Sequence, residues 1–153
     1  MASLDLSKPA LEAAVYNFTL NMAHPAVAAA RHELIQGDAF VHMAELHRNG
    51  RSFDLIIIDP PSFAKKQAEV ERALGAYARL VQLGLALLRP GGALVMASCS
   101  SRLSADQFFR LVHETARGEK RPLQEISRTT HALDHPITFP EGAYLKCLFA
   151  TAP

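Results

Sequence analysis

The chain has 153 residues, of which 49% are hydrophobic and 20% charged, and its net charge is +1. A chain of this length buries about two-thirds of its unfolded surface, enough for one core, so a disordered chain and a disulfide scaffold are excluded. No apolar run approaches the ~18 residues of a membrane span, and the first residues do not form a secretory signal. We therefore expect no membrane contact and a cytoplasmic protein whose two cysteines, Cys99 and Cys147, are thiols. The balanced charge argues against a dedicated polyanion-binding module, so any contact with nucleic acid should be local.

Helices and strands alternate along the chain. Apolar residues at helical spacing predict helices at about 7–21, 39–47, 67–88 and 104–118. Apolar and β-branched runs predict strands at 33–36, 53–58, 93–98, about 123–130 and about 143–150. This order predicts one α/β domain over residues 1–153, with a doubly wound, Rossmann-like sheet that is mostly parallel and has an antiparallel C-terminal strand. The unbroken apolar run at 55–58 predicts a strand buried on both faces.

Ligands of open α/β sheets bind beyond the carboxyl ends of the strands. Four positions follow strands in this way: Asp5, Asp38, Asp59-Pro60-Pro61-Ser62-Phe63 and Ser98-Cys99-Ser100. A carboxylate at a strand end can accept hydrogen bonds from ribose hydroxyls or from an adenine amino group. Asp5 and Asp38 fit these roles, and each is explained equally well as a helix cap.

The Asp59-Pro60-Pro61 motif is more specific. Two prolines after a buried strand hold the backbone extended and aim Asp59 out of the sheet. Phe63 can then stack on a flat base while Asp59 or a prolyl carbonyl hydrogen-bonds the ring edge. The alternative is a Pro-Pro turn with Phe63 in the core.

Cys99 follows a predicted strand and faces the same cleft, which makes it a candidate nucleophile. The alternative is a small buried apolar side chain, because no cation neighbours it in the sequence to favour the thiolate. Cys147 lies within a predicted strand and is interpreted as structural. The seven histidines show no metal-ligand spacing with cysteines or carboxylates, so no metal is predicted.

Five separated motifs, in order, resemble one known family. They are residues 3–12 with Asn21, Gly37-Asp38-Ala39-Phe40, the run from Phe53 to Lys65, Ser98-Cys99-Ser100, and Asp134-His135-Pro136 with the run from Phe139 through Pro140 and Glu141 to Lys146. Together they resemble the catalytic domain of class I S-adenosylmethionine-dependent methyltransferases of the large-subunit ribosomal RNA cytosine-carbon-5 type. The resemblance covers nearly the whole chain.

The resemblance implies that S-adenosylmethionine is the cofactor and that RNA, of ribosomal origin, is the substrate. It makes Asp5 the ribose-binding acid and Asp38 the adenine-binding acid. The other residues expected at the cofactor are Ala39, Asp59 and Pro60, and those expected at the base are Pro61, Ser62, Phe63 and Lys65. It also makes Cys99 the nucleophile, since a thiolate that adds to cytosine carbon 6 activates carbon 5 while Asp59 stabilises ring nitrogen 3.

The family begins with a strand and a Gly-rich turn that approaches the methionine part of the cofactor, and this chain has no match for either. We therefore expect weak or absent binding of S-adenosylmethionine, and a homodimer formed through the edges that the missing strand would leave. A monomer in which residues 1–21 fold into the gap is the alternative. The loop from His135 to Pro140 is expected to be shorter than in the family. Two other functions stay open: methylation of a base nitrogen with Cys99 as a bystander, and a non-catalytic truncated domain that dimerises without cofactor.

Overall fold

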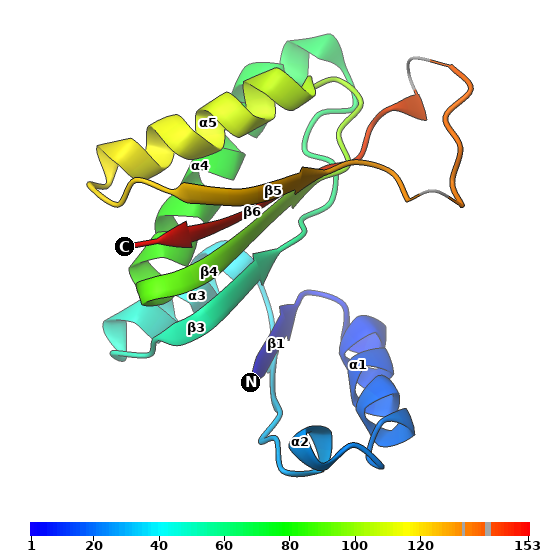
Figure 1. Ribbon diagram of the computed structural model, residues 1–153, viewed down its shortest axis with the longest axis vertical. Helices are drawn as coiled ribbons and strands as arrows, with labels where there is room; N and C mark the ends of the chain where they lie inside the picture. Colours follow the sequence, from blue (N-terminus) through cyan, green and yellow to red (C-terminus); the bar gives the residue numbers. More distant parts are fainter. Residues whose placement is uncertain (133, 140–141) are drawn as a thin grey trace.

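The strands form two separate sheets (Figure 1). The computed structural model describes residues 1–132, 134–139 and 142–153, so Pro140 and Glu141 of the C-terminal motif lie outside the described residues. The smaller sheet pairs β1 (Ala2–Asp5) with β2 (Glu33–Gln36) in parallel. The larger sheet has the order β3-β4-β6-β5, formed by β3 (Phe53–Ile58), β4 (Leu88–Ser98), β6 (Lys146–Ala152) and β5 (Gln124–Thr129).

The larger sheet confirms the predicted fold class. Strands β3 and β4 are parallel, and β6 runs antiparallel to both β4 and β5. The boundaries differ from the prediction in two places, because β4 begins at Leu88 rather than Ala93, and β6 runs from Lys146 to Ala152. The additional residues at the start of β4 include Pro90 and Gly91. Phe53 of β3 pairs with Leu88 and Leu55 with Ala93, so the register between the two strands shifts at this point.

The helices begin where their capping residues predict. Ser7 caps α1 (Lys8–Leu20), and Asp38 caps α3 (Ala39–Arg48). Ser104 caps α5 (Ala105–Gly118) with a reciprocal hydrogen bond from its backbone to the Gln107 side chain. The predicted helix at 67–88 is a short 3-10 turn, η1 (Gln67–Glu69), followed by α4 (Val70–Leu87). A further short helix, α2 (Pro25–Ala28), was not predicted. In the described ranges, no helix is long and apolar enough to cross a membrane.

The core lies between one face of the larger sheet and helices α3, α4 and α5 (Figure 1). Its largest fully buried side chains include Tyr77, Phe108, Leu85, Leu94, Met96 and Leu148. Tyr77 packs edge-on against Phe63 and Phe108, with ring centroids 5.0 and 5.4 Å away. The aromatic cluster therefore extends from the core to the loop after β3.

The opposite face of β3 is open. Ile56 and Ile58 are buried, whereas Leu55 is 52% exposed and Ile57 is 65% exposed. The prediction that this strand is buried on both faces is wrong for the structure, because no helix of the described residues covers this side. Among the residues that the structure describes, β3 pairs with β4 alone and β1 with β2 alone, so the two sheets present unpaired edges.

Candidate functional site

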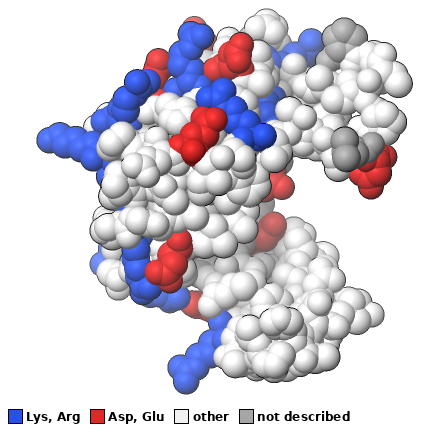
Figure 2. All heavy atoms as spheres, in the orientation of Figure 1, with Lys and Arg blue, Asp and Glu red and all other residues white. Residues whose placement is uncertain are grey.

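A groove of about 440 Å³ separates the two sheets. Its walls come from β1, the start of α3, β3 and the loop after β3. Figure 2 shows the molecule hollowed on one side, between the part built from β1, α1 and α2 and the part built on the larger sheet. The lining includes the predicted cofactor residues Asp5, Asp38, Ala39, Asp59 and Pro60, together with Pro61 and Phe63 of the predicted base site. The groove thus brings together residues that three separate strand ends position.

Asp38 is the cap of α3, whereas Asp5 precedes Ser7, the cap of α1, and both aspartates line the groove. The Oδ1 atom of Asp5 accepts a hydrogen bond from the backbone N–H of Ser7 at 2.7 Å. The Oδ1 atom of Asp38 accepts from the backbone N–H groups of Phe40 and Val41, at 2.7 and 3.3 Å. Since an ionised carboxylate accepts at both oxygens, these bonds occupy Oδ1 and leave Oδ2 for a ligand. For Asp38 the cap and the ligand interpretations are therefore compatible, whereas the cap interpretation of Asp5 is wrong because Ser7 caps α1.

Gly37 precedes Asp38 in a position that excludes a side chain. A Cβ atom at Gly37 would overlap the imidazole ring of His42. The backbone N–H of Gly37 donates to the carbonyl of Asp5 at 3.0 Å, which ties the ends of β1 and β2 together. The close approach fixes the two carboxylates on the same side of the groove.

The loop after β3 presents Asp59 to solvent and turns Phe63 inward. Phe63 is half-buried, because one side packs against Tyr77 while the ring also lines the groove beside Phe40. It thus combines core packing with exposure to the groove. The hydroxyl of Ser62 donates to the carbonyl of Ala64 at 3.2 Å, which stabilises the loop.

Lys65 lies at the exposed end of the same loop. Its backbone N–H donates to Glu69 Oε2 at 2.8 Å, and this bond, with a second from Lys66, lowers the pKa of the Glu69 carboxyl. The side chain of Lys65 is outside the groove lining. Of the predicted base-site residues, Ser62 and Lys65 therefore flank the groove, while Pro61 and Phe63 line it.

Cys99 lies directly against the Asp-Pro-Pro loop. Its half-buried Sγ atom is 3.9 Å from the carbonyl oxygen of Pro60, at hydrogen-bonding distance for sulfur. Both cysteines are free thiols. The structure therefore brings the candidate nucleophile next to the residue that follows Asp59.

A buried polar network lies beneath Cys99. The Tyr77 hydroxyl hydrogen-bonds Ser98 Oγ at 2.8 Å, and burial raises the pKa of Tyr77 above its usual value. Ser98 Oγ accepts from the backbone N–H of Ser100 at 3.3 Å, and the Ser100 hydroxyl donates to the carbonyl of Ala64. These bonds join the loop after β3 to the loop after β4, because Ala64 belongs to the first and Ser100 to the second.

Lys146 is a residue of this region to which the sequence analysis gave no role. Its side chain is buried, and Nζ donates to the carbonyls of Ser100, Leu103 and Tyr144. Burial lowers the pKa of Lys146 from 10.5 to about 8. The sequence does contain an indication of this position. Every second residue of a strand faces the same side, so Lys146 faces the same side as Leu148 and Ala150.

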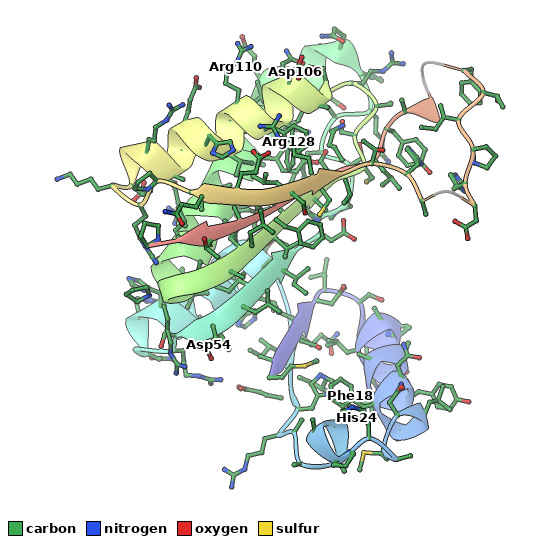
Figure 3. The ribbon with its side chains drawn as sticks, in the orientation of Figure 1. Phe18, His24, Asp54, Asp106, Arg110 and Arg128 are labelled. Atoms are coloured by element: carbon green, nitrogen blue, oxygen red, sulfur yellow. The ribbon has the colours of Figure 1, made fainter. Side chains whose placement is uncertain are left out.

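A second cleft, of about 460 Å³, lies between α5 and β5, away from the groove. Asp106 and Arg110 project from α5 and Arg128 from β5 (Figure 3). Arg128 donates to Glu125 at 2.8 Å and covers the ring of Phe109. No group of three or more His, Cys, Asp or Glu side chains that could hold a metal ion occurs within the described ranges.

The chain is similar over nearly its whole length to methyltransferases of ribosomal RNA. It is 41% identical over 149 residues to a ribosomal RNA large subunit methyltransferase of Deinococcus radiodurans, which covers 97% of this chain and 36% of the relative. It is 38% identical over 152 residues to ribosomal RNA large subunit methyltransferase I of Tolumonas auensis, covering 98% of this chain and 37% of the relative. The chain thus spans little more than a third of the length of these curated relatives. No family model matches it.

Solved structures share the fold. The methyltransferase SMU.776 in complex with SAH superposes with a TM-score of 0.80 at 25% identity, over 98% of this chain and 38% of that one. NSun6 from Pyrococcus horikoshii with SFG gives a TM-score of 0.62 at 17% identity, over 99% of this chain and 40% of that one. The chain therefore has the Rossmann-like α/β fold of S-adenosylmethionine-dependent methyltransferases.

Proposed function

We propose that the chain is part of an S-adenosylmethionine-dependent methyltransferase that modifies carbon 5 of a cytosine in large-subunit ribosomal RNA. The observation that carries this proposal is the position of Cys99, whose Sγ atom lies 3.9 Å from the Pro60 carbonyl beside Asp59. Asp59 and Pro60 line the groove together with Asp5 and Asp38, and Cys99 contacts Pro60 from outside this lining. The similarity to large-subunit ribosomal RNA methyltransferases supports methyl transfer and the RNA substrate, while the choice of cytosine carbon 5 rests on Cys99.

The groove fits the nucleoside end of S-adenosylmethionine. Asp5 and Asp38 each keep a carboxylate oxygen beyond their bonds to backbone N–H groups, which suits ribose hydroxyls and an adenine amino group. Ala39, Phe40 and Pro60 supply apolar walls for the purine ring. When bound, the cofactor supplies an electrophilic methyl group on a sulfonium centre.

Cys99 and Asp59 then act on the base. The Cys99 thiolate adds to carbon 6 of the cytosine, forming a carbon–sulfur bond and making carbon 5 nucleophilic. Asp59, held next to Pro60, acts in its carboxylic acid form: it donates a hydrogen bond to ring nitrogen 3 and so stabilises the negative charge that develops there. After carbon 5 has taken the methyl group and lost its proton to a base, the carbon–sulfur bond breaks and the Cys99 thiolate leaves. Phe63 and Pro61 present the apolar surface against which the base lies.

Methyl transfer to large-subunit ribosomal RNA, measured with millimolar labelled S-adenosylmethionine, tests this proposal. We expect Cys99→Ala to lose transfer and the matched variant Cys147→Ala to retain it, because Cys147 lies within β6. Transfer retained by Cys99→Ala would support methylation of a base nitrogen instead. A folded wild-type chain with no transfer would favour a non-catalytic domain.

We also propose that the chain self-associates as a homodimer through its open edges, in the cytoplasm. The unpaired edges of β1 and β3 flank an apolar stretch in which Leu55 and Ile57 are exposed. Such edges accept another strand, and a two-fold arrangement satisfies both copies at once. Sedimentation over a range of concentrations tests this, since one monomer mass throughout would contradict it.

A further inference from the structure

Lys146 occupies a position that ordinarily holds an apolar residue. It is the first residue of β6, it pairs in register with Ser98, and its side chain is 3% exposed. The next inward-facing residues of the strand, Leu148, Ala150 and Ala152, belong to the core. An ammonium group is costly to bury, so its retention at this site requires specific partners.

Three backbone carbonyls provide these partners. Nζ donates to the carbonyl of Ser100 at 2.5 Å, of Leu103 at 2.7 Å and of Tyr144 at 3.1 Å. The three bonds use all three N–H groups of the ammonium. Carbonyls are neutral, so they orient the group without cancelling its charge.

The carbonyl of Ser100 belongs to the residue that directly follows Cys99. Ser100 is also held through its N–H by Ser98 and through its hydroxyl by Ala64. Lys146 supplies the third contact to Ser100, and its bond to Leu103 fixes the other end of the same loop. The segment that carries Cys99 is therefore anchored on both sides by one ammonium group.

The ionisable groups that act on one another here come from four elements. Cys99 interacts electrostatically with Lys146 of β6 and with Tyr77 of α4. Burial raises the pKa of Tyr77 and of Cys147, and the charge of Asp59, which follows β3, raises both further. Lys146 is the cation of this set, and burial reduces the screening of its charge.

We propose that Lys146 is a positioning residue for Cys99: it holds the loop that carries the thiol against Pro60 and provides the positive charge that favours the thiolate. The inference deepens the proposed function, because it rests on Cys99 as the nucleophile. A solely structural anchor would fix the loop without changing how readily the thiol ionises. The two roles therefore differ in a measurable way.

Alkylation of Cys99 by iodoacetamide reports thiolate formation without RNA or cofactor. In a Cys147→Ser background, Cys99 is the remaining cysteine of the chain. The rate of alkylation is measured from pH 6 to 10 in this parent, in Lys146→Met and in Lys146→Gln. Glutamine keeps N–H donors for the carbonyls and removes the charge, so it is the variant that preserves the fold if methionine does not.

Arg121 offers a matched control at the opposite end of β6. Its guanidinium donates to the carbonyls of Leu85 and Leu88 at 2.6 Å and to that of Ala152 at 3.3 Å. It is thus also a cation that holds backbone carbonyls, but it lies far along the strand from Cys99. Arg121→Gln therefore removes a comparable anchor without removing the charge beside the thiol.

Because the pKa of Lys146 is about 8, its charge is present mainly below that pH. We therefore expect both Lys146 variants to shift the low-pH part of the alkylation profile, with a reaction up to about tenfold slower at pH 7 and a smaller difference above pH 8. Arg121→Gln should lower the melting temperature and leave the alkylation rate at pH 7 unchanged. A folded Lys146→Gln with the parent's alkylation rate at pH 7, or an equal shift in Arg121→Gln, would overturn the inference. If the shift occurs but Cys99→Ala retains methyl transfer, the positioning effect stands and the proposed chemistry fails.

Discussion

The hydrogen bond between Tyr77 and Ser98 offers a quantitative test of the buried network under the candidate site. Both side chains are completely buried, and their oxygens are 2.8 Å apart. Tyr77→Phe removes the phenolic oxygen while keeping the edge-on ring contacts with Phe63 and Phe108. Losing one buried hydrogen bond, with Ser98 left short of a partner, should lower the free energy of unfolding by about 1–2 kcal/mol. For a chain of this length that is roughly 3–6 °C in melting temperature.

A double-mutant cycle isolates the bond from other effects of each change. Ser98→Ala should cost at least as much as Tyr77→Phe, because it also leaves the backbone N–H of Ser100 without its acceptor. Urea unfolding of the single and double variants should give a coupling energy of about 1 kcal/mol between the two sites. Tyr16→Phe is the matched control: Tyr16 is 63% exposed, so the change should stay within about 0.5 kcal/mol. Strictly additive losses at Tyr77 and Ser98 would refute the network.

Four further predictions concern the groove and the buried lysine. Asp38→Asn keeps a good helix cap, so the free energy of unfolding should change by less than about 0.5 kcal/mol. Calorimetry should show that the same variant binds S-adenosylmethionine at least tenfold more weakly. For the wild-type chain we expect a dissociation constant above about 10 µM, since the groove lining, within the described residues, includes no glycine-rich turn for the methionine end; low-micromolar binding would contradict this. Ile57→Asp should leave the monomer folded by circular dichroism, because Ile57 is 65% exposed, and should shift sedimentation to the monomer. Between pH 8 and 10.5, Lys146 is largely neutral in the folded chain and largely protonated in the unfolded chain. The free energy of unfolding should therefore rise with pH in this range, by at most about 1.4 kcal/mol per pH unit. Urea unfolding of Lys146→Met should lack this rise.

Local signals in the sequence predict much of the fold. The helix starts at Ser7, Asp38 and Ser104 were predicted because a side-chain oxygen at these positions satisfies free N–H groups of the first turn. The central strands were predicted from continuous apolar runs, and β3 matches its expected bounds. Helix caps and apolar runs depend on residues that are close in the sequence, so they can be recognised without knowledge of the tertiary structure.

The environment of β3 could not be predicted in the same way. The run 55–58 is apolar throughout, but burial depends on what packs against each face. Helix α4 covers the side of Ile56 and Ile58, with Gly84 against both, while the described residues leave Leu55 and Ile57 open. An apolar pattern therefore indicates which faces a strand can bury, and tertiary packing decides which faces it does bury.

The direction of β6 explains why its role at the site was missed. Searching the residues that follow each strand finds Asp5, Asp59 and Cys99, because parallel strands bring their carboxyl ends to one edge of the fold. Strand β6 is antiparallel to β4, so its first residue rather than its last lies at that edge. The pairing of Ser98 with Lys146 places the lysine beside the end of β4, and its side chain then reaches the carbonyl of Ser100. In a mixed sheet, the candidate site thus includes the residue that begins each antiparallel strand, and this position in the chain holds the cation next to the candidate nucleophile.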